Sequence, residues 1–142
     1  MISKTLQDAV NEQINKELYS SYLYLSMAAY FESINLPGFA RWMYVQVDEE
    51  RGHGMKLFSH LVDRGGKVIL KLIAGPDTDW KSNLDVFKHV QTHEAAVTAS
   101  INALYEQALK ERITRYRSSC SGSSLNRWKK KRTQLKLSSS LS

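Results

Sequence analysis

The 142-residue sequence contains a single cysteine, Cys120, and no apolar run of the roughly 18 residues that a membrane-spanning helix needs. One cysteine excludes a framework of internal disulfides and is typical of a chain kept in a reducing compartment. Residues 1–4 also lack the apolar segment of a signal peptide. We therefore expect a cytoplasmic protein without a membrane span.

Acidic residues are missing from the C-terminal part of the chain. Residues 1–111 hold all 14 Asp and Glu and 11 of the 20 Lys and Arg, whereas residues 112–142 hold nine basic residues, nine serines and no acid. A difference in charge of this size between two parts of a sequence indicates a domain followed by a tail of different character. We expect one domain over residues 1–111, long enough for a sizeable core, followed by a basic, serine-rich tail over 112–142.

Three stretches have the periodicity of long amphipathic helices, at residues 5–33, 37–64 and 82–111. Ser3 is placed to cap the first helix and Pro37 to begin the second. The predicted inward-facing residues are Val10, Ile14, Glu17, Ser21, Tyr24, Ala28 and Phe31, then Phe39, Met43, Gln46, Glu50, His53, Leu57 and Leu61, and finally Phe87, Val90, Glu94, Val97, Ile101, Leu104 and Ala108.

Residues 65–81 form a long connection between the second and third helices. At ~3.3 Å per residue the connection can span ~55 Å, whereas a helix of ~27 residues is only ~40 Å long. The connection can therefore run the length of a bundle and start the third helix at the end where the second began. The sequence Val68-Ile69-Leu70 predicts a short strand-like piece, lying along the bundle or against a neighbouring subunit.

Each predicted helix carries an acid near the middle of its apolar stripe: Glu17, Glu50 and Glu94. Burying a carboxylate costs several kcal/mol unless it is paired or binds a cation. Glu50 and His53 are three residues apart and share one helix face. Carboxylate oxygens and imidazole nitrogens together suit iron, zinc or manganese. We therefore expect a shared metal site inside the bundle rather than three acids at solvent-facing stripe edges.

Four segments of this sequence match the pattern of one known family: 11–24, the motif Glu49-Glu50-x-x-His53-x-x-Lys56, residues 63–66, and His93-Glu94. From about residue 5 to 111 the chain resembles the bacterial non-haem ferritins. The resemblance implies an all-α fold, a ferritin-like four-helix bundle with a long crossover, and assembly of 24 copies into a shell. It also implies iron storage, with Fe(II) oxidised by dioxygen or peroxide at a di-iron centre in each bundle.

The resemblance further implies the site residues. The expected ligands of the di-iron centre are Glu17, Glu50, His53 and Glu94, with Glu50 bridging the two irons. Tyr24 would sit beside the centre, and Glu49 would belong to a third, inward-facing iron site. No haem is expected, because the haem methionine of bacterioferritin lies two residues before the motif histidine, where this chain has Arg51. The remaining histidines are expected at the surface or at stripe edges: His60, His89 and His93.

The chain departs from the ferritin pattern after about residue 111. The family's fourth helix should carry a tryptophan and then a Glu/Gln-rich run of ligands, but here the apolar periodicity is lost. Residues 112–142 can be interpreted as a disordered basic tail, as a nucleic-acid-binding arm around Trp128, or as the product of a one-base shift of reading frame. We favour the third interpretation. Tryptophan has one codon, TGG, so Trp128-Lys129 read one base earlier gives GAA, a glutamate codon, and residues 121–131 can be back-read as Q-W-F-x-x-E-Q-V-E-E-E.

Loss of a native fourth helix would remove apolar packing worth ~1.5–3 kcal/mol per side chain from a domain with a net stability of only ~5–15 kcal/mol. We therefore expect a lost or non-native fourth helix, a loosened fold and weakened ferroxidase activity. The alternative function is that of a nucleic-acid-associated, mini-ferritin-like protein using the basic tail. Glu17, Glu50 and Glu94 argue against this alternative, because they indicate a metal site within one bundle, whereas mini-ferritins bind metal between subunits. The absence of a second E-x-x-H motif argues against a ferritin-like peroxide reductase.

Overall fold

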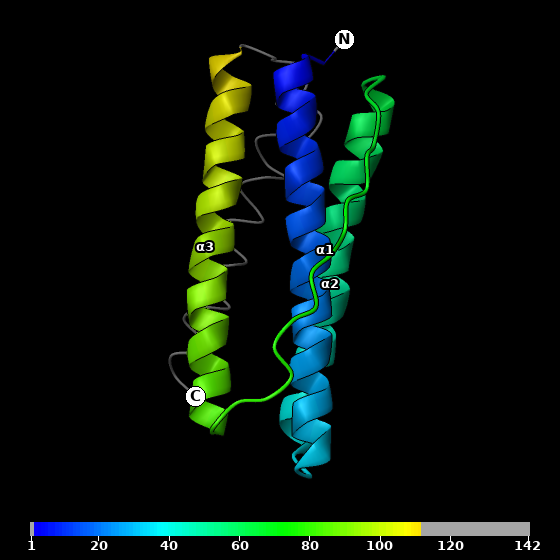
Figure 1. The fold of residues 1–142 in the computed structure, drawn as a ribbon. Helices are drawn as coiled ribbons and strands as arrows, with labels where there is room; N and C mark the ends of the chain where they lie inside the picture. The colour runs from blue at the N-terminus through cyan, green and yellow to red at the C-terminus, as the bar shows by residue number, and fades with distance from the viewer. Residues whose placement is uncertain (1, 112–142) are drawn as a thin grey trace.

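The computed structural model describes residues 2–111, which form three long α-helices (Figure 1). Helix α1 spans Lys4–Ser33, α2 spans Pro37–Asp63 and α3 spans Asn83–Lys110. These bounds lie within one residue of the predicted ones, so the all-helical prediction is confirmed over this range. The predictions of a lost fourth helix, a basic tail and a shifted reading frame concern residues 112–142, which lie outside the described residues.

Local sequence signals begin the three helices. The Ser3 hydroxyl accepts a hydrogen bond from the Leu6 N–H (3.1 Å), and the Ser82 hydroxyl accepts one from the Asp85 N–H (3.2 Å). Each bond satisfies a backbone donor that has no partner inside the helix. Pro37 occupies the first turn of α2, where its missing N–H costs nothing.

Two glycines end α2. Gly65 has a φ of +74°, a left-handed conformation that favours glycine. The following Gly66 donates its N–H to the Leu61 carbonyl (2.9 Å) and lies so close that an added Cβ would be 2.4 Å from Leu61 Cδ1. The chain can therefore leave the helix tightly packed against its last turn.

Helix α1 is the central element and packs against both other helices (Figure 1). It runs antiparallel to each: the Ser21 hydroxyl donates to the Val47 carbonyl (2.9 Å), and Ser3, just before α1, donates to Glu111 at the end of α3 (2.8 Å). The segment between α2 and α3, here called the crossover, runs back along the bundle, so that α3 begins at the end where α2 began (Figure 1). This is the course that its length predicted.

The crossover is held by a buried side chain. Asn11 of α1 donates through Nδ2 to the Lys67 carbonyl and accepts the Ile69 N–H at Oδ1, both at 2.9 Å. The structure contains no strand within residues 2–111, so residues 68–70 form no strand along the bundle, where the backbone bonds to the Asn11 side chain instead. Pairing of this segment with a neighbouring subunit stays a prediction.

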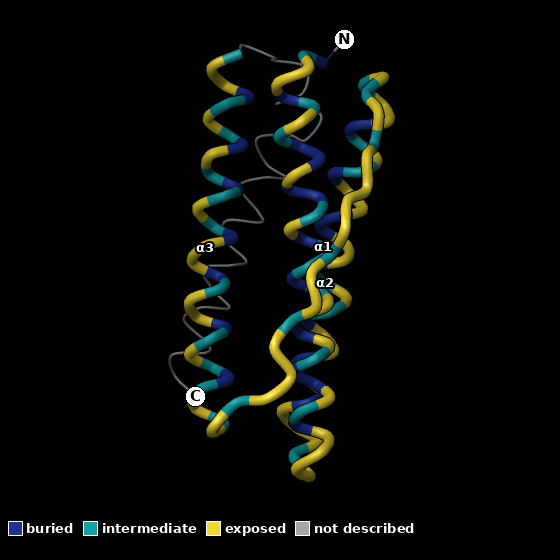
Figure 2. The backbone as a smooth tube through the Cα atoms, viewed as in Figure 1, coloured by how far each residue is buried: buried dark blue, intermediate teal, exposed yellow. Residues whose placement is uncertain are grey.

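The core forms two apolar clusters along the bundle, and buried residues recur along every helix (Figure 2). Several buried polar residues have positions along the helices that fall between the two clusters, namely Glu17, Gln46, Glu50, His53 and Glu94. The first cluster includes Leu6, Val10, Leu57, Leu61 and Ile101, and the second includes Tyr24, Met27, Phe31, Met43 and Val90. Most predicted inward positions are buried, but Phe39 is 39% exposed, and Ser21 and Phe87 are only half-buried, while their neighbours Ala40, Ser20 and Val86 are buried. The predicted stripe drifts at these points because 3.6 residues per turn is not matched by fixed steps of three and four.

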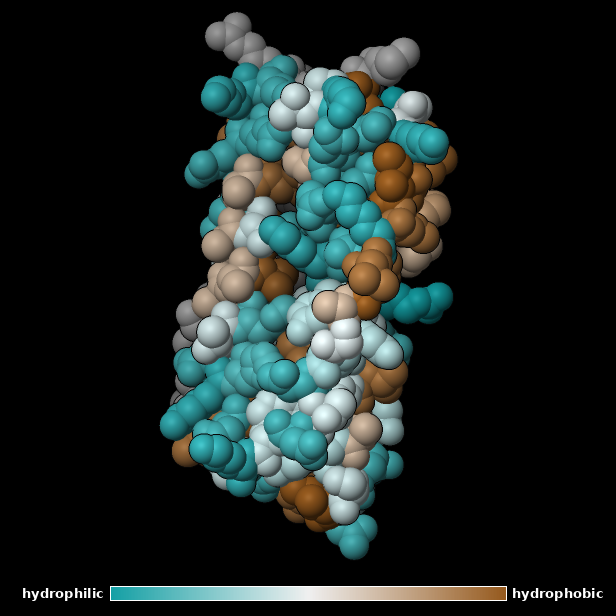
Figure 3. All heavy atoms as spheres, viewed as in Figure 1, coloured by the Kyte–Doolittle hydropathy of each residue, from teal (hydrophilic) through white to brown (hydrophobic). Residues whose placement is uncertain are grey.

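Apolar side chains also reach the surface over the crossover (Figure 3). Leu70 is 64% exposed and Leu72 is 92% exposed. None of the helices within residues 2–111 is both long and apolar enough to span a membrane.

Candidate metal centre

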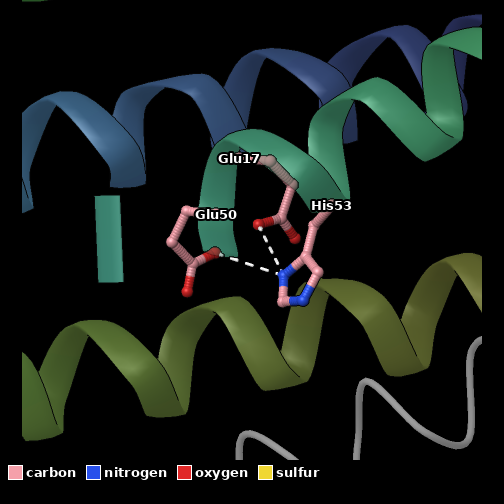
Figure 4. Close-up of side chains that lie close together, drawn as sticks. All are labelled: Glu17, Glu50 and His53. Atoms are coloured by element: carbon pink, nitrogen blue, oxygen red, sulfur yellow. Dashed lines mark ion pairs between the residues drawn. The ribbon is translucent and has the colours of Figure 1, made fainter. Parts of the chain in front are cut away.

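Three potential metal ligands converge where α1 and α2 pack together (Figure 4). Glu17 comes from α1, and Glu50 and His53 come from successive turns of α2. All three are buried, and one ligand atom from each lies within 4.8 Å of the others. His53 Nδ1 is 3.5 Å from Glu50 Oε2 and 3.8 Å from Glu17 Oε2. The helical spacing thus brings the predicted Glu50–His53 pair together, and the antiparallel packing adds Glu17.

A residue that the sequence interpretation missed positions Glu17. Gln13 is buried and donates a hydrogen bond from Nε2 to Glu17 Oε1 (3.2 Å). The signal was its spacing: residues four apart on a helix are neighbours, and a glutamine can hydrogen-bond an acid at that distance. Gln13 therefore fixes one carboxylate oxygen, while the other faces His53.

The electrostatics of the cluster favour positive charge. Burial alone disfavours the imidazolium form of His53, but hydrogen bonds with Glu17 and Glu50 outweigh burial and raise the pKa of His53. One imidazole, even when protonated, cannot neutralise two buried carboxylates. The remaining negative charge is costly to bury without compensation. A divalent cation bound here would supply the missing charge, and oxygen and nitrogen donors of this kind suit iron, zinc or manganese.

Glu94, the third predicted acid, is buried on α3 and lies outside the three-residue group. Its Oε1 accepts a hydrogen bond from the hydroxyl of Tyr24, which is also buried. Tyr24 in turn packs edge-on against the ring of His93, with centroids 6.1 Å apart. Tyr24, a member of the second apolar cluster, therefore links the acid of α3 to α1.

The remaining predicted residues lie outside the three-residue group. Glu49 is half-buried, on a different face of α2 from Glu50, and it does not join the three-residue group. His60, His89 and His93 are all half-buried, which agrees with the prediction of stripe-edge positions. Sequence reasoning missed one contact of His93: its Nε2 lies 2.7 Å from the hydroxyl of the buried Ser20.

Comparison with known proteins places this geometry in a family. Residues 7–116 match the ferritin-like domain. A bacterial non-heme ferritin of Bacteroides fragilis (strain 638R) is 44% identical over 112 residues, covering 79% of this chain and 70% of that protein. An open pore ferritin of the archaeon Archaeoglobus fulgidus has 41% identity and a TM-score of 0.89, covering 98% of this chain and 83% of that one. Chlorobium tepidum ferritin has 31% identity and a TM-score of 0.87, covering 99% of this chain and 83% of that one. The chain therefore belongs to the ferritin family.

Proposed function

We propose that this chain binds and oxidises Fe(II) and takes part in iron storage, with iron as its substrate. The observation that carries the proposal is the buried group of Glu17, Glu50 and His53, whose ligand atoms lie within 4.8 Å of one another. Without a cation this cluster holds two carboxylates in the core at considerable cost. Membership of the ferritin family supports iron as the cation.

The proposed roles are those that the ferritin resemblance implies for these residues. Glu17, Glu50 and His53 would hold the first Fe(II), and Glu50 would be shared with a second Fe(II) that Glu94 also holds. Carboxylates are hard, anionic ligands that stabilise Fe(III) over Fe(II), so binding here favours loss of an electron. The two irons together give two electrons to dioxygen, which takes up two protons and leaves as hydrogen peroxide. Tyr24 orients Glu94 through its hydrogen bond.

We further propose that oxidation is slow in this chain. The fourth helix implied by the ferritin resemblance supplies further carboxylates, but residues 112–142 contain no Asp or Glu. The second iron therefore has fewer anionic ligands than in a ferritin with an acidic fourth helix. Fewer carboxylates stabilise Fe(III) less, so the electron transfer is less favoured.

The remaining parts of the proposal rest on family membership. The chain associates with copies of itself without completing the 24-subunit shell of its family, works in the cytoplasm and binds no haem, and Glu49 contributes to a third iron site. No comparison or structural observation favours the alternative of a nucleic-acid-associated protein. That alternative depends on residues 112–142, outside the described range.

The test compares two histidines of the same helix. The full chain, its His53→Ala variant and its His60→Ala variant are loaded with Fe(II) without oxygen and then exposed to air, and ferric absorbance is followed. We expect the unmodified chain and His60→Ala to bind Fe(II) and oxidise it slowly, and His53→Ala to lose most of the binding. Equal Fe(II) binding by the unmodified chain and both variants would contradict the proposed role of His53 as an iron ligand. Rapid stoichiometric oxidation, with a 24-subunit peak by light scattering, would overturn the proposed impairment alone.

We also propose that the segment after about residue 111 is read in a shifted frame. The codon argument at Trp128-Lys129 supports this, as does the loss of every acid at the same boundary. The test is the nucleotide sequence across residues 110–112 and onward. Codons incompatible with a glutamate run in the neighbouring frame would contradict it.

A further inference from the structure

Gln46 is a buried side chain that the proposed chemistry does not yet use. It is only 2% exposed, and its Oε1 accepts no hydrogen bond from any of the residues that the structure describes. A buried amide oxygen without a donor is costly, and native proteins rarely leave one without a reason. An oxygen of this kind is suited to a bound cation, which supplies the missing partner.

Gln46 lies on the same face of α2 as the metal ligands. It precedes Glu50 by four residues, the spacing that places two side chains on adjacent turns, whereas His53 follows Glu50 on the other side. Its level in the bundle is fixed by the neighbouring Val47, whose carbonyl accepts the Ser21 hydroxyl of α1. Tyr24, one turn further along α1, donates to Glu94. Gln46 is therefore on the Tyr24 and Glu94 side of Glu50, away from His53.

This position is on the side of the proposed second cation, which has fewer assigned ligands than the first. The first cation has three ligands within 4.8 Å of one another, whereas the second has only Glu50 and Glu94 among the described residues assigned to it. We propose that Gln46 Oε1 is an additional ligand of the second cation. A neutral amide oxygen is a hard donor that accepts Fe(II) but adds no negative charge, so it supports ferrous binding more than ferric retention. The inference rests on the proposed function, because it concerns the same cations.

The test measures cation binding without oxidation. The full chain and the variants Gln46→Leu and Gln46→Glu are titrated with Co²⁺ under anaerobic conditions by calorimetry, with the visible absorption of Co²⁺ reporting its coordination. We expect two cations to bind the unmodified chain. Gln46→Leu should keep the first and bind the second roughly 10- to 100-fold more weakly, the usual loss when a supporting group at a metal site is removed. Gln46→Glu, which retains an oxygen donor, should restore the second affinity.

Asn102 offers a matched control, since its Oδ1 is also buried without a partner among the described residues but lies eight residues along α3 from Glu94. Asn102→Leu should leave both affinities unchanged. Thermal unfolding of metal-free Gln46→Leu should occur at the same or a higher temperature than that of the unmodified chain, because the substitution removes an unpaired polar atom. An unchanged second affinity in Gln46→Leu, or a single cation in the unmodified chain, would overturn this inference alone. No cation binding at all would overturn the proposed function with it.

Discussion

Replacing Glu50 by glutamine tests the centre most directly, because the change removes one charge and almost no volume. Glu50 Oε2 lies 3.5 Å from His53 Nδ1, inside the three-ligand group. A unit charge about 4 Å away is worth about 4 kcal/mol at an effective dielectric constant near 20. Losing that attraction should raise the dissociation constant for a divalent cation by on the order of a thousandfold.

Thermal unfolding with and without Mn²⁺ turns this loss into a measurable shift. A cation at about 100 times its dissociation constant stabilises the unmodified chain by about 2.7 kcal/mol. At about 2–4 °C per kcal/mol for a chain of this size, the melting temperature should rise by roughly 5–11 °C. With a thousandfold weaker site, the same concentration should raise that of Glu50→Gln by less than about 1 °C. Each rise is measured against the metal-free melting temperature of the same variant, because Glu50→Gln also removes the Glu50–His53 pair.

The matched control is Glu12→Gln, which removes an acid from the exposed face of α1. Glu12 pairs with Lys71 at the surface, and that contact lowers the pKa of Glu12. Exposed pairs contribute about 0–1 kcal/mol, so Glu12→Gln should keep the full Mn²⁺-dependent rise. The reasoning would be refuted by an equal rise in Glu50→Gln, because the cation would then bind elsewhere.

Three further predictions follow from the described contacts. The raised pKa of His53 contributes stability that is fully present below its unfolded pKa near ~6.5 and is lost as pH rises through the folded pKa. The melting temperature of the metal-free, unmodified chain should therefore fall across that pH window. The melting temperature of metal-free His53→Asn should not. Asn11→Leu removes two hydrogen bonds to the crossover and should cost about 1–3 kcal/mol by denaturant unfolding; an unchanged midpoint would show that the crossover needs no such anchor. Gly66→Ala places a Cβ 2.4 Å from Leu61 Cδ1, which should cost about 1–3 kcal/mol, while Gly52→Ala, with open space around it, should cost none of this strain.

The three helices could be predicted because their signals are local. Ser3 caps α1 and Pro37 begins α2, as expected from side-chain hydrogen bonding and a fixed φ. The course of the crossover also followed from its length. Residues 68–70 form no strand along the bundle because the Ile69 N–H bonds to the side chain of Asn11, which is distant in sequence; pairing with a neighbouring subunit stays a prediction.

Part of the candidate site could be predicted from the sequence, because two of its residues are close together in the chain. Glu50 and His53 lie on one helix, so their separation follows from helical geometry alone. The contribution of Gln13 is equally local but was missed, since a glutamine beside an acid carries no distinctive pattern. The link between Tyr24 and Glu94 spans two helices, and only their packing reveals it.

The sequence by itself determined the helices, the acid in the middle of each and the family resemblance, because periodicity and spacing act within one stretch of chain. Only the tertiary structure decided which ligands meet. It joined Glu17 to Glu50 and His53 within 4.8 Å and bound Glu94 to Tyr24. It also left Gln46 Oε1 buried with no donor among the described residues. The physical reason is that contacts between helices depend on the rotation and height at which each packs, and these are set by the core as a whole.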